Sequence, residues 1–137
     1  MKDRLILTVG LPRSGKSTWA RHTGRPIVNP DSIRLALHGN AFLKEAEPMV
    51  WVIAKYMVEA LFLAGHHIVI LDACNVTRKA RDQWRTGDWS VEYVVFSTPK
   101  ELCMDRARRT TPESNLEGIL EAIDRMDSQF ESLEDDE

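Results

Sequence analysis

Short apolar runs and amphipathic segments alternate along this chain. Four apolar runs predict β-strands at residues 5–9, 26–29, 68–71 and 91–96. Helical periodicity and helix-stop residues predict α-helices that begin at Ser17 and that span residues 31–37, 47–64, 77–85, 99–109 and 115–133. Strands and helices in this order favour an α/β fold, in which a parallel sheet of about four strands has helices on both faces.

Several of these helices carry further expectations. The segment 47–64 is apolar on nearly all sides, so we expect it to be buried against the sheet. Asp31 or Ser32 is expected to cap the short helix that begins there, and Thr77 the helix 77–85. The last helix has a narrow apolar seam, which predicts packing on its own domain. Self-association through this seam is the less favoured alternative. The seam residues are at positions 116, 119, 123, 126, 130 and 133.

Length and composition indicate one globular domain. The chain has 137 residues, and 43% of them are hydrophobic, which suits a single domain with an ordinary core. We expect the domain to span residues 1–133 and residues 134–137 to form a frayed acidic tail.

The sequence contains no obvious targeting or membrane segment. No basic start leads into an apolar stretch, and the longest apolar segment, residues 49–64, is interrupted by charge and too short to cross a bilayer. We therefore expect a cytoplasmic protein without a membrane partner. Cys74 and Cys103 lack metal-ligand spacing and are expected to be buried free thiols rather than a disulfide.

The net charge of −3 conceals an uneven distribution. Residues 113–137 contain ten acidic residues and one basic residue, whereas residues 1–112 contain seventeen basic and eleven acidic residues, a balance of +6. A basic body suits phosphorylated or polyanionic partners. Charge alone fits a solvated surface with a solubilising tail equally well.

The strongest chemical signal is a phosphate-binding loop. Residues 10–18 read Gly-Leu-Pro-Arg-Ser-Gly-Lys-Ser-Thr, between a predicted strand and a predicted helix. In this context backbone N–H groups converge on phosphate oxygens, and the helix N-terminus adds partial positive charge. Lys16 is expected to reach the terminal phosphates, and the Ser17 hydroxyl to ligate Mg²⁺. The expected nucleotide-binding residues are Gly10, Pro12, Arg13, Ser14, Gly15, Lys16, Ser17 and Thr18.

Two carboxylates follow predicted strands. Asp31 follows the second strand, and Arg34 lies one helical turn later. At the carboxyl end of a parallel sheet, Asp31 would share a crevice with the phosphate-binding loop and could accept a hydroxyl proton, while Arg34 holds a substrate anion. The alternative is that Asp31 only caps its helix. Asp72 ends the third strand, where a carboxylate can meet Mg²⁺ or its waters, and Asn75 follows.

Arginines gather near the end of the helix 99–109. Arg106, Arg108 and Arg109 precede a Thr-Thr-Pro loop. Arginines on a mobile lid can close over a transferring phosphate and neutralise developing charge. Favourable placement at a helix C-terminus is the alternative, but three arginines within four residues favour the lid.

Three segments of the chain resemble the polynucleotide kinase family of P-loop phosphotransferases, notably the 5′-kinase domain of the phage T4-type enzyme. They are Gly-Lys-Ser-Thr-Trp-Ala-Arg (15–21), Asn-Pro-Asp-Ser-Ile-Arg (29–34) and Leu-Asp-Ala-Cys-Asn (71–75). With the spacing to the arginine-rich helix, the resemblance covers about residues 4–130. It implies an adenylate-kinase-like fold with an arginine-bearing lid, ATP as donor with Mg²⁺, and the 5′-hydroxyl of a nucleic acid as acceptor.

The resemblance also implies roles for individual residues. Asp31 is the general base, Arg34 grips a substrate phosphate, and Arg106 with Arg109 reaches the donor phosphates beside Lys16. Asp72 and Asn75 are assigned to substrate binding, and Asp72 also to Mg²⁺ together with Ser17.

The chain departs from the family pattern in three respects. Arg13 stands where the family usually has glycine, which loses backbone freedom but brings a guanidinium to the phosphates. The second lid arginine is offset by one residue, so Arg108 competes with Arg109 for that role. We expect no phosphatase or ligase domain beside the kinase segment.

Two other functions fit the same residues. A small-molecule or nucleoside kinase would use Lys16, Ser17 and Asp31 and differ only in its acceptor. A nucleotide-binding regulatory module without transfer activity would need no general base at Asp31. A GTPase is not favoured, because no Asn-Lys-x-Asp segment occurs.

Overall fold

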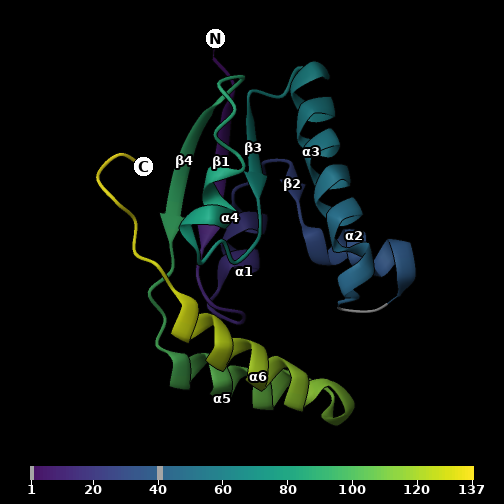
Figure 1. Cartoon of the computed structure of the whole chain (residues 1–137), viewed down its shortest axis with the longest axis vertical. Coiled ribbons are helices and arrows are strands. Elements are labelled where there is room, and N and C mark those ends of the chain that lie inside the picture. The colour runs from purple at the N-terminus through teal and green to yellow at the C-terminus, as the bar shows by residue number, and fades with distance from the viewer. Residues whose placement is uncertain (1, 40–41) are drawn as a thin grey trace.

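The computed structural model describes residues 2–39 and 42–137. Its sheet has four parallel strands in the order β2-β3-β1-β4. Their bounds are β1 Arg4–Val9, β2 Ile27–Val28, β3 Ile68–Leu71 and β4 Ser90–Val95. Because all four strands run in one direction, their carboxyl ends meet at one edge of the sheet, as the arrowheads in Figure 1 show.

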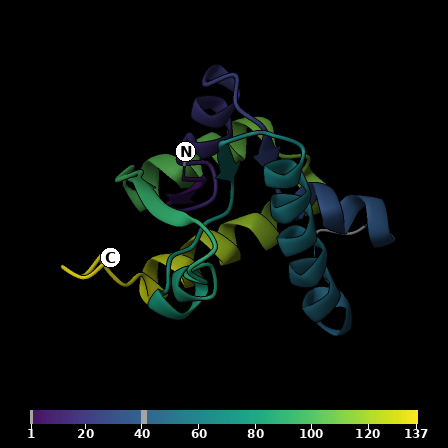
Figure 2. The ribbon, with the colours of Figure 1, turned by 90° about the horizontal axis from the view of Figure 1, so that it is seen from above.

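Helices cover both faces and one end of this sheet. Their bounds are α1 Lys16–His22, α2 Pro30–His38, α3 Glu47–Leu63, α4 Arg78–Asp82, α5 Lys100–Thr110 and α6 Glu113–Gln129, with a short 3₁₀ helix, η1 Lys44–Ala46, before α3. In Figure 2, α1 lies on one side of the sheet and α3 and α4 lie on the other. The helices α5 and α6 lie against each other across the carboxyl end (Figure 1). The predicted α/β fold, its element order and its two-sided covering are confirmed.

The long helix α3 departs from expectation. Val50, Ala54 and Val58 are buried in the core that also contains Leu5 and Leu7 of β1. Its outer side is exposed and still apolar, because only one side of the helix meets the narrow sheet. The exposed fractions are 56% at Met49, 45% at Val52, 67% at Tyr56 and 89% at Leu63. The prediction that this helix is buried against the sheet therefore holds for one of its sides only.

No helix among the described residues combines the length and apolarity needed to span a membrane. Cys103 is buried, Cys74 is half-buried, and both are free thiols.

The apolar seam of α6 packs within the chain. Leu116, Ile119, Ile123 and Met126 join a second core with Cys103, Ala107 of α5 and Leu11 of the phosphate-binding loop. The prediction that this helix packs on its own domain is confirmed for these four seam residues.

Helix caps separate a correct prediction from a wrong one. The Thr77 side chain accepts a hydrogen bond from the Ala80 N–H at 3.2 Å and caps α4, as predicted. The cap of α2 is Asn29, not Asp31 or Ser32. Its side-chain oxygen accepts from the Asp31 N–H at 2.8 Å, and Pro30 occupies the first helical turn, where a missing N–H costs nothing.

The chain end has partners within the protein. After α6, the Glu131 N–H donates to the Val76 carbonyl at 2.8 Å. We expected residues 134–137 to fray, but the side chain of Glu137 is fully buried against Arg81, and Asp136 pairs with Arg78. The charge pairs come from α4, a helix far from the tail in sequence.

Candidate active site at the carboxyl end of the sheet

The loop between β1 and α1 depends on two glycines. A Cβ atom at Gly10 would lie 2.8 Å from Ser14 Oγ and 2.9 Å from Phe96 Cβ, so a side chain has no room there. Gly15 caps α1 with a φ of 103°, in the left-handed region that glycine adopts readily. These two positions fold the loop back over the start of the helix.

Lys16 points into this loop. Its side chain is buried, and Nζ donates to the Leu11 carbonyl at 2.6 Å and lies 3.5 Å from Ser14 Oγ. The ammonium therefore lies among backbone groups beside the N-terminus of α1, which is the position where a phosphate binds in such loops.

Arg13 connects the loop to the lid. Its φ of 67° is a left-handed conformation that costs an ordinary residue roughly 1–2 kcal/mol, which explains why glycine suits the position. Its guanidinium donates to Thr111 Oγ1 at 2.8 Å at the end of α5. In return, Arg106 donates to the Arg13 carbonyl at 3.1 Å and Thr98 to the Ser14 carbonyl at 2.9 Å. Three hydrogen bonds thus hold the lid to the loop.

The other lid arginines lie farther out. Arg108 pairs with Asp105 at 3.0 Å on the exposed side of α5. Arg109 is exposed and makes no hydrogen bond or ion pair with any residue that the structure describes. Of the predicted lid arginines, only Arg106 is brought to the phosphate-binding loop.

Asp72 is a buried carboxylate served by neutral donors. Its Oδ2 accepts from Ser17 Oγ at 2.7 Å and from Asn29 Nδ2 at 3.1 Å, and the residue is 5% exposed. Within the described residues no basic side chain pairs with it. A buried carboxylate beside a hydroxyl is a donor set that fits a hard divalent cation, which in kinases is bound by few protein groups and by the substrate phosphates.

Asn29 is the residue that sequence reasoning overlooked. Its amide donates to Asp72 and accepts from the Asp31 N–H, so one side chain joins the end of β3 to the start of α2. The signal was present, since asparagine before Pro-Asp is a typical helix start. What the sequence did not reveal is that the amide also reaches Asp72.

Asp31 and Arg34 lie together as predicted, but Arg34 has a second partner. Asp31 is 80% exposed, and its Oδ1 accepts from Arg34 at 2.7 Å. The other edge of the Arg34 guanidinium forms two hydrogen bonds with Glu47 at the start of α3, at 2.7 and 2.9 Å. Burial lowers the pKa of Arg34, but the bonds to Glu47 and Asp31 outweigh it and leave that pKa above its ordinary value.

Asn75 lies apart from these residues. Its side chain is buried, and Nδ2 donates to the Thr8 carbonyl at 2.8 Å, between β1 and β3. Its φ of 47° turns the chain there, and its own carbonyl accepts from Arg81. Asn75 therefore fixes the loop after β3 and does not line the crevice.

A cavity of about 250 Å³ opens beside Ser17, Asn29 and Asp72. Its lining residues are Ser17, Arg21, Ile27, Asn29, Ser32, Met57 and Asp72.

Cys74 lies near Lys16 and Asp72. Burial raises the pKa of its thiol, although Lys16 opposes the shift. The thiol is therefore neutral and a weak nucleophile, so the reactive chemistry of the crevice belongs to its oxygen and nitrogen groups.

Comparison with known proteins identifies the fold. Residues 5–133 match the family described as AAA domain. A chain in a structure of the Pnkp1/Rnl/Hen1 complex is 30% identical with a TM-score of 0.69, over 82% of this chain and 41% of that chain. In a second structure, of the Pnkp1/Rnl/Hen1 RNA repair complex, the values are 22% and 0.68, over 95% and 47%. This chain thus spans less than half of the length of those two chains.

Small-molecule kinases are similar over more of their own length. A sugar kinase from Janibacter sp. HTCC2649 is 24% identical with a TM-score of 0.63, over 98% of this chain and 82% of that chain. An APS kinase from Mycobacterium tuberculosis, in complex with AMPPNP and APS, is 19% identical with a TM-score of 0.65, over 98% and 85%. At these identities the likeness concerns the fold, which is that of P-loop kinases.

Proposed function

This chain belongs to the AAA domain family, and on that premise we propose that it is a kinase that transfers the γ-phosphate of ATP to the 5′-hydroxyl of a polynucleotide. The observation that carries the proposal is the connection of Asp31 to the nucleotide site. Asn29 joins the start of α2 to Asp72, and Asp72 accepts from Ser17 of the phosphate-binding loop. The backbone of Asp31, the candidate base, is thereby linked to the residues that we expect to meet the donor phosphates, which supports the proposal.

The proposed transfer assigns each group one task. Asp31 accepts the proton of the acceptor hydroxyl as that oxygen bonds to the γ-phosphorus and the bond to the β-phosphate oxygen breaks, which leaves ADP. Lys16 and Arg106, which donate to backbone carbonyls of the phosphate-binding loop, would neutralise charge on the donor phosphates. The Arg34 side chain is only 14% exposed, so a phosphate of the acceptor strand would reach it by replacing its contact with Asp31, which is 80% exposed.

Mg²⁺ fits the oxygen pair of Ser17 and Asp72. When bound, the ion would neutralise the β- and γ-phosphates of the nucleotide. The neutral donors on Asp72 leave the carboxylate charge uncompensated, which supports a cation at this point rather than a purely structural ion pair.

A small-molecule kinase is the second candidate. The crevice cavity of about 250 Å³ is of a size for a sugar or nucleoside, and the sugar and APS kinases are matched over most of their length. The basic balance of residues 1–112 and the Asp31–Arg34 pair support the polynucleotide instead. A nucleotide-binding module without catalysis would bind ATP and label no acceptor.

A labelling panel tests the proposal. The protein is incubated with γ-labelled ATP, Mg²⁺ and, in separate reactions, 5′-hydroxyl DNA, 5′-hydroxyl RNA, nucleosides and sugars. We expect label on the 5′ ends of the polynucleotides, and labelling roughly 10²-fold slower with the Asp31→Asn variant. Label on sugars or nucleosides alone supports the second candidate, and ATP binding without any labelled acceptor supports the regulatory module.

A further inference from the structure

Three arginines surround the acidic end of the chain, and we call them, with the acidic residues they bind, the tail cluster. Arg78 and Arg81 lie in α4, and Arg85 follows it. Arg81 is fully buried and forms two hydrogen bonds with Glu137 through Nε and Nη2. Its Nη2 also donates to the Ser132 carbonyl, and its Nη1 donates to the Asn75 carbonyl. The Arg81–Glu137 pair is therefore an interior contact that fixes the tail to the body.

The other two arginines are held differently. Both Asp136 carboxylate oxygens accept from Arg78, at 2.7 and 2.8 Å, and one also lies 3.7 Å from Arg85. Arg85 donates to the Asp136 carbonyl at 3.0 Å, and Glu134 lies 3.6 Å from Arg78. An arginine fork that binds a carboxylate through two oxygens binds a phosphate in the same way. The Asp136 carboxylate thus occupies the position that a phosphate would take between two guanidinium groups.

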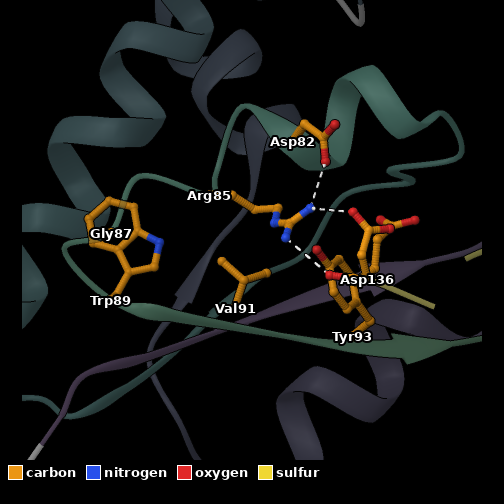
Figure 3. Close-up of a pocket in the computed structure, with 8 residues that line it drawn as sticks. Asp82, Arg85, Gly87, Trp89, Val91, Tyr93 and Asp136 are labelled. Carbon is orange, nitrogen blue, oxygen red and sulfur yellow. Dashed lines mark hydrogen bonds and ion pairs between the residues drawn. The ribbon is translucent and has the colours of Figure 1, made fainter. Parts of the chain in front are cut away.

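A cavity lies directly beside this position, and Figure 3 shows Arg85 reaching across it between Asp82 and Asp136. Its volume is about 610 Å³, and Trp89, Val91 and Tyr93 line it from the β4 side. The Tyr93 hydroxyl is buried and finds no hydrogen-bond partner in the part of the chain that the structure describes. A buried hydroxyl without a partner is costly unless a ligand or water satisfies it.

The acidic tail reverses the charge of this cluster. With Glu137 kept on Arg81 and Asp82 on Arg78, the three arginines leave one net positive charge. Glu134 and Asp136 change it to one net negative charge. We propose that Arg78, Arg85 and Tyr93 form a second anion site, distinct from the phosphate-binding loop, that takes backbone phosphates of a single-stranded polynucleotide, and that Glu134 and Asp136 are its internal competitors.

The ligand follows from the chemistry of the groups. Two guanidinium groups and a phenolic hydroxyl can all donate hydrogen bonds to an anion. The cavity beside them is large enough for a nucleotide unit. The inference relies on the proposed function for the choice of a polynucleotide, but not for the existence of the site. Binding can be measured without ATP, so a failure of this site is distinguishable from a failure of phosphoryl transfer.

The experiment compares binding of a fluorescein-labelled single-stranded 12-mer DNA, without ATP, by the parent protein and by Glu134→Gln/Asp136→Asn. We expect the variant to bind more tightly, with a salt dependence steeper by about 0.7 in log–log slope for each additional phosphate that an arginine neutralises. Adding Arg85→Ala to the variant should remove the increase in affinity. Pyrophosphate is titrated as a competitor. If it displaces the 12-mer only from the phosphate-binding loop, the higher affinity of the tail variant over the parent remains, as a second site requires.

A matched control variant tests whether the change in net charge alone raises the affinity for the 12-mer. Glu117→Gln/Glu121→Gln makes the same change in net charge on exposed positions of α6. Thermal unfolding confirms that each variant is folded, and Glu137 stays unchanged so that the buried pair is preserved. An equal increase in affinity in the control variant, no increase in the tail variant, or an increase that survives Arg85→Ala overturns the proposal.

Discussion

The crevice around Asp72 and the tail cluster on α4 both hold carboxylates, but with opposite kinds of partner. Asp72 is buried and accepts from the neutral groups of Ser17 and Asn29. Asp136 is exposed and accepts from the charged fork of Arg78. A carboxylate with neutral donors retains its charge for a ligand cation, whereas one paired with arginine neutralises a surface that could bind anions. The comparison separates a site that is ready for its ligand from one that the protein itself occupies.

Replacing Lys16, whose ammonium group lies in the phosphate-binding loop, should have the largest effect. We expect Lys16→Ala to lower the rate of phosphoryl transfer by roughly 10²- to 10³-fold, because Lys16 stabilises charge that grows on the phosphates in the transition state. Single-turnover transfer measures the loss. Lys79→Ala, an exposed lysine on α4, serves as control and should transfer normally. Near-normal transfer by a folded Lys16→Ala protein would contradict the assignment of the loop.

Asp31 comes next, because it is either a general base or only the ion-pair partner of Arg34. We expect Asp31→Asn to bind ATP normally and to lower the transfer rate by roughly 10²-fold. Its melting temperature should change little, since Asn29 caps the helix and the Asp31–Arg34 pair is exposed at Asp31. Persistent activity with a lower melting temperature would show that Asp31 is only structural.

Asn29 tests the connection within the crevice. Asn29→Ala should lower the free energy of unfolding by about 1 kcal/mol for the lost cap and by a further ~1.5 kcal/mol for the lost hydrogen bond to a charged group. Asn29→Ser can still cap α2 but cannot donate to Asp72 in the same way, so it should be less destabilised while its transfer rate is also reduced. Denaturant unfolding and transfer assays separate the two effects. Equal stability of both variants would argue against the double role.

The tail cluster should show the smallest effect and a distinct pH dependence. Hydrogen bonds from Arg78 and Arg81 hold the pKa values of Asp136 and Glu137 below their ordinary range. These depressed pKa values mean that the pairs stabilise the fold above the unfolded-state pKa of about 4 and lose that contribution as the pH falls further. The melting temperature of Glu137→Gln should therefore be below that of the parent at pH 7, and the difference should shrink toward pH 3. A constant difference would contradict the ion-pair origin.

The same contrast explains what the sequence predicted. Crevice residues follow strand ends, so local patterns alone predict that Lys16, Ser17, Asp31 and Asp72 lie at one edge of the sheet. The contacts that sequence reasoning missed join segments distant in the chain. Glu47 reaches Arg34 across thirteen residues, and Glu137 reaches Arg81 across fifty-six. The exposed side of α3 was also missed, because helical periodicity does not tell how wide the sheet beneath a helix is.

A competition between acceptors tests the central claim most directly. The protein is given γ-labelled ATP, Mg²⁺ and equal concentrations of a 5′-hydroxyl oligonucleotide and a free nucleoside in one reaction, so that the ratio of products reports the ratio of kcat/KM values. We expect the oligonucleotide to take most of the label, and its advantage to fall as salt rises because phosphate contacts release counterions. A salt-insensitive preference for the nucleoside would contradict a polynucleotide kinase and assign the chain to the small-molecule kinases.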